Sequence, residues 1–149
     1  MITSFLAGIF VRNIDVVIGT SPQFFTSVSA SLLAAFKKKP FIFELRDLWP
    51  ESIKAVGVMK DNILLRWLER LELYLYNRAD GIVCVTNSFQ KILFNRGIRA
   101  DKIHVVTNGV NTKNYIFQGK DNVLLNKLGL QKKYIVGYVG THGMAHSLD

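Results

Sequence analysis

Charged side chains follow directly after an apolar run in residues 41–52, which read FIFELRDLWPES. The apolar run predicts a buried strand, so Glu44, Arg46, Asp47 and Glu51 come at or just after its carboxyl end. Ligands of open α/β sheets bind at that end of the strands. Two interpretations remain open. The cluster is either a structural ion pair, since buried charges need partners, or a binding site.

The composition fits about one globular domain with a hydrophobic core. The chain has 149 residues, of which 49% are hydrophobic and 20% charged, too few charges for a disordered chain. The net charge of +8 either favours anionic partners (nucleotide phosphates, acidic lipid head groups or nucleic acid) or serves solubility alone. The single cysteine, Cys84, excludes an internal disulfide. It lies in an apolar run, where we expect it to pack as a small hydrophobe, and it fits a reducing cytoplasm.

The first twelve residues, MITSFLAGIFVR, are apolar but too short to span a bilayer. They also lack the basic start and small-residue cleavage site of a signal peptide. They predict a helix that packs on the core or, alternatively, rests on a membrane surface.

The chain then alternates between predicted strands and helices. Strands are predicted at residues 15–20, 41–47, 81–86 and 103–107. Ser21 is expected to cap the first intervening helix, and Pro22 to take its first position. Its predicted apolar face consists of Phe25, Val28, Leu32 and Phe36, with Ser29, Ala30 and Ala34 small enough for close approach to a sheet.

A second helix is predicted at residues 62–79 from its apolar repeat, with Leu64, Leu68, Leu71 and Leu75 on the buried face and Trp67 and Tyr74 widening it. A third is predicted from possible caps Asn87 and Ser88 to Gly97. Strands alternating with helices imply an α/β fold, a Rossmann-like parallel sheet flanked by helices.

The pattern changes after Asn108. Residues 111–120 are polar and predict a linker, a short helix follows at 122–128, and Gly129 ends it. Residues 134–140 predict a fifth strand, the first of a second Rossmann-like domain. The predicted domains are therefore residues 1–112 and 113–149.

Glycines recur after that fifth strand, at Gly137, Gly140 and Gly143. Backbone N–H groups at such a turn either cradle phosphate or allow close packing. His142 and His146 have helical spacing, but the glutamate of a zinc-protease motif is missing, so no metal site is expected.

Five segments together carry a resemblance: DVVIGTSP, FIFELRDLWPES, YNRADGIVCVT, KIHVVTNGVN and YVGTHGMAHSLD. They closely resemble bacterial family 4 glycosyltransferases, in particular enzymes that build O-antigen, capsule and related surface polysaccharides. The resemblance covers the chain from about Asp15 onward. It is specific in the combination of RDLWPES, NGV and GTHG.

The resemblance implies a GT-B enzyme with two Rossmann-like domains, the acceptor on the first and the nucleotide-sugar donor on the second. Residues 1–112 would be the later part of the acceptor-side domain, and 113–149 the linker and beginning of the donor-binding domain. Such enzymes are typically retaining and need no metal or cofactor. The implied partners are a nucleotide sugar, expected to be UDP-linked, and a lipid-linked or polysaccharide acceptor, with peripheral membrane contact and no nucleic acid. The implied location is the cytoplasm, peripheral on the inner face of the plasma membrane.

The same resemblance assigns the site residues. Arg46 and Asp47 correspond to a strand-end pair, His-Asp in many members, that faces the reacting sugar and is catalytic. A guanidinium cannot act as a base, so Arg46 would orient groups or balance charge. The implied substrate-binding residues are Glu51, Asn108, Gly109, Gly140, His142 and Gly143.

The segments that precede and follow these motifs in the family are absent from the sequence. The chain thus resembles an internal fragment, and we expect little or no transferase activity from it alone. The alternatives are a non-catalytic remnant or binding module whose sheet edges a partner covers, and a nucleotide-dependent oxidoreductase, which the glycine spacing disfavours.

Overall fold

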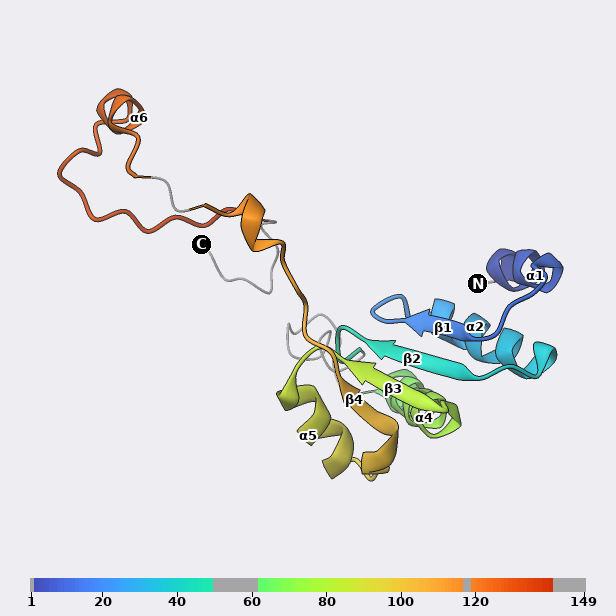
Figure 1. Cartoon of the computed structure of the whole chain (residues 1–149). Coiled ribbons are helices and arrows are strands. Elements are labelled where there is room, and N and C mark those ends of the chain that lie inside the picture. Colours follow the sequence, from blue (N-terminus) through green and yellow to red (C-terminus); the bar gives the residue numbers. More distant parts are fainter. Residues whose placement is uncertain (1, 50–61, 117–118, 141–149) are drawn as a thin grey trace. The chain divides into compact units, whose positions relative to one another are not determined.

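The computed structural model describes residues 2–49, 62–116 and 119–140 (Figure 1). The chain divides into two compact units, Met1–Asn108 and Gly109–Asp149, and each is described by itself. The domain assignment to residues 1–112 and 113–149 stays a prediction.

The first unit is built on a four-stranded parallel sheet with the order β1-β2-β3-β4 (Figure 1). Its strands are β1 (Val17–Thr20), β2 (Phe41–Leu45), β3 (Gly81–Cys84) and β4 (Ile103–Val105). All three pairings are parallel. The prediction of an α/β fold with a Rossmann-like parallel sheet is therefore confirmed. Each strand lies within its predicted range.

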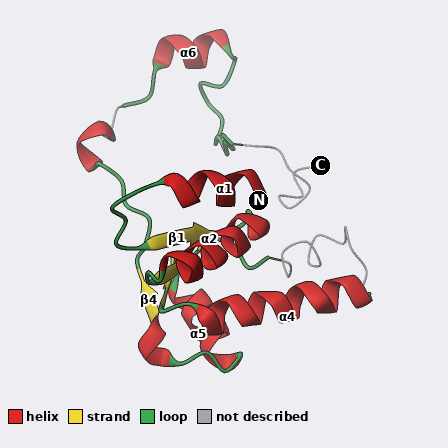
Figure 2. Ribbon diagram, turned by 90° about the vertical axis from the view of Figure 1, so that its right-hand side faces the viewer, coloured by secondary structure: helices red, strands yellow, loops and turns green. Residues whose placement is uncertain are grey.

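Helices connect and flank the strands (Figures 1 and 2). The first unit contains α1 (Ile2–Phe10), α2 (Phe24–Lys37), α4 (Ile63–Arg78), α5 (Asn87–Asn95) and the 3-10 turn η1 (Ala100–Lys102). The second unit contains the 3-10 turn η2 (Thr112–Asn114) and α6 (Asn122–Lys127).

The hydrophobic core lies between one face of the sheet and the helices. Neighbouring strands are also neighbours in the sequence, so right-handed crossovers put α2, α4 and α5 on the same face. Phe43 on that face meets the Tyr76 ring of α4 edge-on at 5.0 Å. Cys84 is fully buried there, as predicted, and burial raises the pKa of its thiol. On the opposite face Ile18 is 59% exposed.

Helix α2 turns a different face to the sheet from the one predicted. Its buried residues are Phe24, Ser27, Ser29, Ser31 and Ala34. Phe25, Leu32 and Phe36 are exposed, so the predicted apolar face is wrong apart from Val28, which packs against the core. The cause is the close approach of α2 to β1. A Cβ atom on Gly19 would lie 2.9 Å from the Cβ of Ala30 and 3.1 Å from the Cα of Ser27. Only small side chains fit at this contact, as expected for Ser29, Ala30 and Ala34.

Helix α4 begins as predicted but buries an unexpected residue. The Asn62 side chain accepts a hydrogen bond from the Leu65 N–H and caps the helix. Leu68 and Leu75 are buried as predicted. Trp67 is 55% exposed, Tyr74 is 59% exposed and Leu64 is 53% exposed, so this part of the predicted face is wrong. Glu72, a charged residue of the same helix, is only 1% exposed.

Helix α5 is capped one residue earlier than predicted. The side chain of Thr86, and not that of Asn87 or Ser88, accepts a hydrogen bond from the Phe89 N–H. The predicted end at Gly97 is confirmed, and its φ of 84° is one that glycine adopts readily.

Helix α1 lies against α2 without burying a residue, so the prediction that it packs into the core is wrong. The Phe5 and Phe36 rings meet edge-on with centroids 6.3 Å apart. The Lys37 ammonium donates hydrogen bonds to the carbonyls of Ile9 and Val11, where the helix dipole favours a cation. No helix in the described part of the chain is long and apolar enough to cross a bilayer.

The second unit contains the predicted short helix but not the predicted strand. Asp121 caps α6 by accepting hydrogen bonds from the Val123 and Leu124 N–H groups. Gly129, with φ at 66°, follows it as expected. Residues 134–139 form no strand and are exposed, which overturns the fifth strand. A strand needs a neighbouring backbone to accept and donate its hydrogen bonds.

Candidate functional site

The carboxyl ends of β1 and β2 bring three polar side chains together. Thr20 and Glu44 lie opposite each other in the register of these strands. The Thr20 hydroxyl donates to Glu44 Oε2 at 2.6 Å, and Arg46 Nη2 donates to Glu44 Oε1 at 2.9 Å. Both hydrogen bonds lower the pKa of Glu44. The one from Arg46 has the larger effect, and the one from Thr20 the next largest. Glu44 is therefore held as a carboxylate.

The pairing of Arg46 with Glu44 supports the ion-pair interpretation without excluding a binding role. The Arg46 side chain is 56% exposed and that of Glu44 is 26% exposed. A guanidinium has five N–H donors. Arg46 can therefore hold Glu44 and still donate to an anionic ligand at the edge of the sheet.

Ser21 fixes the backbone that carries Arg46 and Asp47. Its hydroxyl accepts hydrogen bonds from the Arg46 N–H at 3.0 Å and the Asp47 N–H at 3.2 Å, and donates to the Asp47 carbonyl at 3.0 Å. Its own N–H donates to the Glu44 carbonyl at 2.9 Å. The predicted capping role of Ser21 is thus wrong. Helix α2 begins at Phe24, after Gln23, because the Ser21 hydroxyl is used across the sheet.

Aromatic packing holds the next part of the loop. Leu48 is buried, and the Trp49 ring lies 4.7 Å from the Phe24 ring and 6.4 Å from the Phe25 ring, between centroids. A hollow of about 260 Å³ lies beside Trp49 at the start of α2. The RDLW segment is therefore anchored on both sides, by Ser21 and by α2.

Asp47 is half-buried. No hydrogen bond or ion pair joins its carboxylate to another side chain among the residues that the structure describes. It follows Arg46 directly, so the two predicted catalytic residues share this edge of the sheet. Their catalytic role stays a prediction.

Asn108 and Gly109 follow β4. The Val106 N–H still pairs with the Cys84 carbonyl, after which the chain leaves the sheet. Because all four strands are parallel, Asn108 comes off the same edge as Arg46 and Asp47. Strand β3 lies between β2 and β4, and Asn108 is exposed. Gly109 is the first residue of the second unit.

Gly140 is the one remaining predicted substrate-binding residue within the described part of the chain. Gly140 is exposed in the second unit, where a Cβ atom on it would lie 2.9 Å from the Tyr138 hydroxyl oxygen. Glu51, His142 and Gly143 lie outside the described residues. A phosphate-binding role for these glycines stays a prediction.

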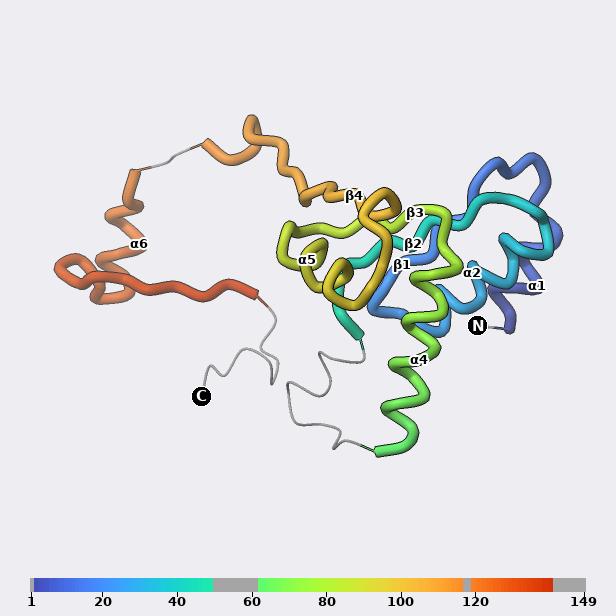
Figure 3. The backbone as a smooth tube through the Cα atoms, turned by 90° about the horizontal axis from the view of Figure 1, so that it is seen from below, coloured from blue at the N-terminus to red at the C-terminus, as the bar shows by residue number. Residues whose placement is uncertain are grey.

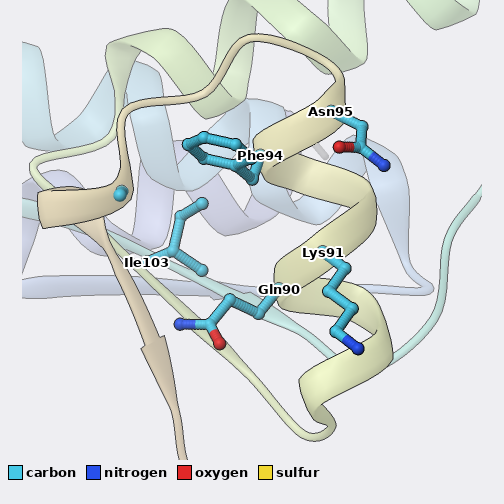
Figure 4. Close-up of a pocket in the computed structure, with 6 residues that line it drawn as sticks. Gln90, Lys91, Phe94, Asn95 and Ile103 are labelled. Carbon is cyan, nitrogen blue, oxygen red and sulfur yellow. The ribbon is translucent and has the colours of Figure 1, made fainter.

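A further hollow of about 320 Å³ lies between α5 and the start of β4 (Figure 4). Figure 4 shows Phe94 and Gln90 reaching from α5 toward Ile103, while Lys91 and Asn95 lie along the flank of the helix. Ile103 begins β4, so this hollow is at the amino end of the sheet. It lies away from the edge that carries Arg46 and Asp47.

The sequence alone assigned no role to Thr20 and only a helix-capping role to Ser21, and it marked Glu44 only as part of a charged run. Two signals pointed to them. Thr20 is the last residue of one predicted strand, Ser21 follows it, and Glu44 lies in the second half of the next predicted strand. Parallel strands place such ends side by side, but the register that pairs Thr20 with Glu44 is a tertiary property.

A Rossmann-like sheet with a polar cluster at its carboxyl edge defines an α/β protein of the kind that binds ligands at that edge. Residues 2–114 match the family model described as Glycosyltransferase Family 4. The match covers more than half of the chain, which therefore belongs to glycosyltransferase family 4. No match was found among curated proteins.

Proposed function

We propose that this chain serves sugar transfer from a nucleotide sugar, UDP-linked, to a lipid-linked or polysaccharide acceptor in the synthesis of a bacterial surface polysaccharide. The observation that carries the proposal is the family match over residues 2–114, which includes the Glu44, Arg46 and Asp47 cluster. Residues 1–112 would contribute the acceptor side, and residues 113–149 the beginning of the donor side. The single buried cysteine suits a reducing cytoplasm.

In the proposed chemistry, the positive guanidinium of Arg46 and the negative carboxylate of Asp47 stabilise opposite charges that develop during sugar transfer. Departure of a nucleoside diphosphate develops negative charge, which a guanidinium such as that of Arg46 stabilises. The sugar develops oxocarbenium character, which a nearby carboxylate such as Asp47 favours. Arg46 cannot accept a proton, so its role is to bind and orient.

Glu44 and Ser21 would act as positioning residues for this pair. Glu44 holds the guanidinium through one oxygen while Thr20 holds the other oxygen. Ser21 bonds to both backbone N–H groups of the Arg46–Asp47 pair. A site held within a fraction of an ångström is what orientation effects in catalysis require.

Calorimetric titration of the purified chain with UDP-sugars, GDP-sugars and NAD tests the proposal. We expect binding of a nucleotide sugar, with UDP forms preferred, and none of NAD. Arg46→Gln should weaken that binding about tenfold or more, because it removes a charge-assisted hydrogen-bond donor. Arg12→Gln is the matched control. It removes an exposed cation that precedes β1, at the other end of the sheet.

Because we expect little or no sugar transfer from this chain alone, the role of Asp47 is tested by binding of a cationic mimic of the oxocarbenium sugar, with Asp47→Asn against the control Asp15→Asn. Asp15 also precedes β1, and its side chain is fully exposed. Loss of binding of the mimic only in Asp47→Asn would support its role. Binding of NAD in place of nucleotide sugars would refute the proposal. If Arg46→Gln left the affinity for nucleotide sugars unchanged, the carboxyl end of the sheet would not be part of the binding site.

A further inference from the structure

Three aromatic rings meet at the start of α2. The Trp49 ring lies 4.7 Å from the Phe24 ring and 6.4 Å from the Phe25 ring, between centroids. Phe24 is buried, whereas Phe25 is 51% exposed and Trp49 is half-buried. The planes of Phe25 and Trp49 form an angle of 62°, so these two rings do not cover each other's faces. Aromatic surface is therefore left for a ligand.

The hollow beside these rings combines aromatic surface with two uncharged polar side chains. It measures about 260 Å³ and is lined by Pro22, Gln23, Phe24, Phe25, Thr26 and Trp49. None of these six residues is charged. The Gln23 side chain is exposed and makes no capping hydrogen bond to α2, so its amide can bind a ligand. Thr26 is also exposed and adds a hydroxyl group that donates and accepts hydrogen bonds.

The hollow adjoins the Arg46–Asp47 pair. Trp49 lies two residues after Asp47, and Pro22 directly follows Ser21. The Ser21 hydroxyl accepts hydrogen bonds from the backbone N–H groups of both Arg46 and Asp47, at 3.0 Å and 3.2 Å. Figure 3 shows the segment after β2 beside the start of α2, where the aromatic rings meet. A group held in the hollow therefore lies next to the two predicted catalytic residues.

These properties favour a sugar ring as the ligand. One face of a hexose carries C–H groups, which the negative face of an aromatic ring attracts, while its rim carries hydroxyl groups. Aromatic walls beside an amide and a hydroxyl group match both parts. Pockets that enclose a whole drug-sized ligand measure about 300–1,000 Å³, so this hollow holds about one ring. An isoprenoid chain would desolvate the Gln23 amide without giving it a hydrogen-bond partner.

We propose that this hollow, which we call the Trp49 subsite, binds the sugar ring of the acceptor and sets which acceptor is taken. The sugar packs its C–H face on Phe25 and Trp49, while Gln23 and Thr26 bind its hydroxyl groups. The inference rests on the proposed function, which assigns the acceptor to residues 1–112 but names no residue that holds its sugar. A nucleobase stacks on aromatic rings as well, so the test compares a base with a sugar.

Tryptophan fluorescence measures binding at the Trp49 subsite directly. The chain has two tryptophans, and the other one, Trp67, is 55% exposed on α4. Trp67→Phe therefore leaves Trp49 as the single reporter. This variant is titrated to about 10 mM with methyl glycosides of hexoses and N-acetylhexosamines, because ligands of so few atoms bind in the millimolar range. Uridine and farnesyl phosphate are the base and lipid probes. We expect a saturable change in Trp49 emission with a glycoside and with neither of the other probes.

Two further substitutions in the Trp67→Phe background test the aromatic wall and the polar groups separately. Phe25→Leu should weaken glycoside binding about threefold to tenfold because it removes an aromatic face, whereas Phe25→Tyr should retain the binding. Gln23→Ala should weaken it about threefold or more through the loss of a hydrogen bond. The matched controls are Phe94→Leu and Gln90→Ala, which change the hollow at the amino end of the sheet. Both controls should bind glycosides like the parent chain. Circular dichroism and melting temperature verify that each variant is folded.

The proposal is overturned if no glycoside changes the Trp49 emission, or if Phe25→Leu and Gln23→Ala bind glycosides as tightly as the parent chain. A response to uridine or farnesyl phosphate at lower concentration than to any glycoside would make the hollow a base or lipid site and would also overturn it. Failure of the proposed function gives a different result. Glycoside binding without nucleotide-sugar binding in the calorimetric titration would keep the sugar site and refute only the proposed function.

Discussion

The buried carboxylate of Glu72 gives the sharpest test of how the first unit is held together. Its side chain is 1% exposed. The Tyr76 hydroxyl donates to its Oε1 at 2.5 Å, and Arg96 Nη1 donates to its Oε2 at 2.9 Å. Glu72 and Tyr76 lie on α4, and Arg96 is the C-cap of α5, so the carboxylate links the two helices that precede and follow β3 in the sequence.

Replacing Arg96 by Met should cost about 3–5 kcal/mol in the free energy of unfolding, because a buried carboxylate loses its cation. Replacing Glu72 by Gln should cost about 1–3 kcal/mol, since Tyr76 keeps an acceptor while the pairing with Arg96 is lost. The double variant should be more stable than Arg96→Met alone, because it removes the buried carboxylate together with its Arg96 partner. The expected coupling energy is about 2 kcal/mol.

Urea unfolding followed by circular dichroism measures these energies through the midpoint and slope of each transition. Arg99→Met is the control, because the Arg99 and Asp101 side chains are 73% and 61% exposed. It should leave the midpoint unchanged. If Arg96→Met cost no more than Arg99→Met, or if the double variant showed the sum of the single effects, the reasoning about a buried charge link would be refuted.

Three further predictions concern the candidate site and its support. The pKa of Glu44 is lowered from its ordinary value of 4.5, so its carboxylate stabilises the fold above that pH, and this stability is lost as the pH falls through the lowered pKa. Glu44→Gln should therefore flatten the acid side of a plot of unfolding free energy against pH, and an unchanged plot would contradict the pairing. Ser21→Ala should cost about 1–3 kcal/mol in urea unfolding, since two N–H groups and the Asp47 carbonyl lose their partner. Gly19→Val should cost about 1–3 kcal/mol through overpacking against α2, whereas Gly109→Ala, with no atom within 4 Å of the added Cβ, should melt at the parent temperature.

Local patterns were sufficient for much of the architecture. Apolar runs predicted strands at residues 41–47 and 81–86, and a helical repeat predicted a helix at 62–79, where the structure has β2, β3 and α4. Each strand-to-strand connection contains a helical segment, a pattern that favours parallel pairing. Parallel pairing in turn places Arg46, Asp47 and Asn108 at one edge, so that part of the candidate site was predictable.

Other predictions failed where a residue depends on distant neighbours. Apolar periodicity placed Phe25 and Phe36 on the buried face of α2, but close approach at Gly19 admits only small side chains. Local periodicity does not predict the burial of Glu72, because its partner Arg96 lies 24 positions away. Residues 134–139 have the composition of a strand, yet they have no strand partner among the described residues.

The sequence by itself determined the order of strands and helices, the direction of the sheet and the family, because these follow from local periodicity, connection length and short motifs. The tertiary structure alone decided that Ser21 binds the Arg46–Asp47 backbone, that Glu44 holds the guanidinium, and that α1 buries no residue. These depend on strand register and on the distance between packed elements, which no local stretch of the chain encodes.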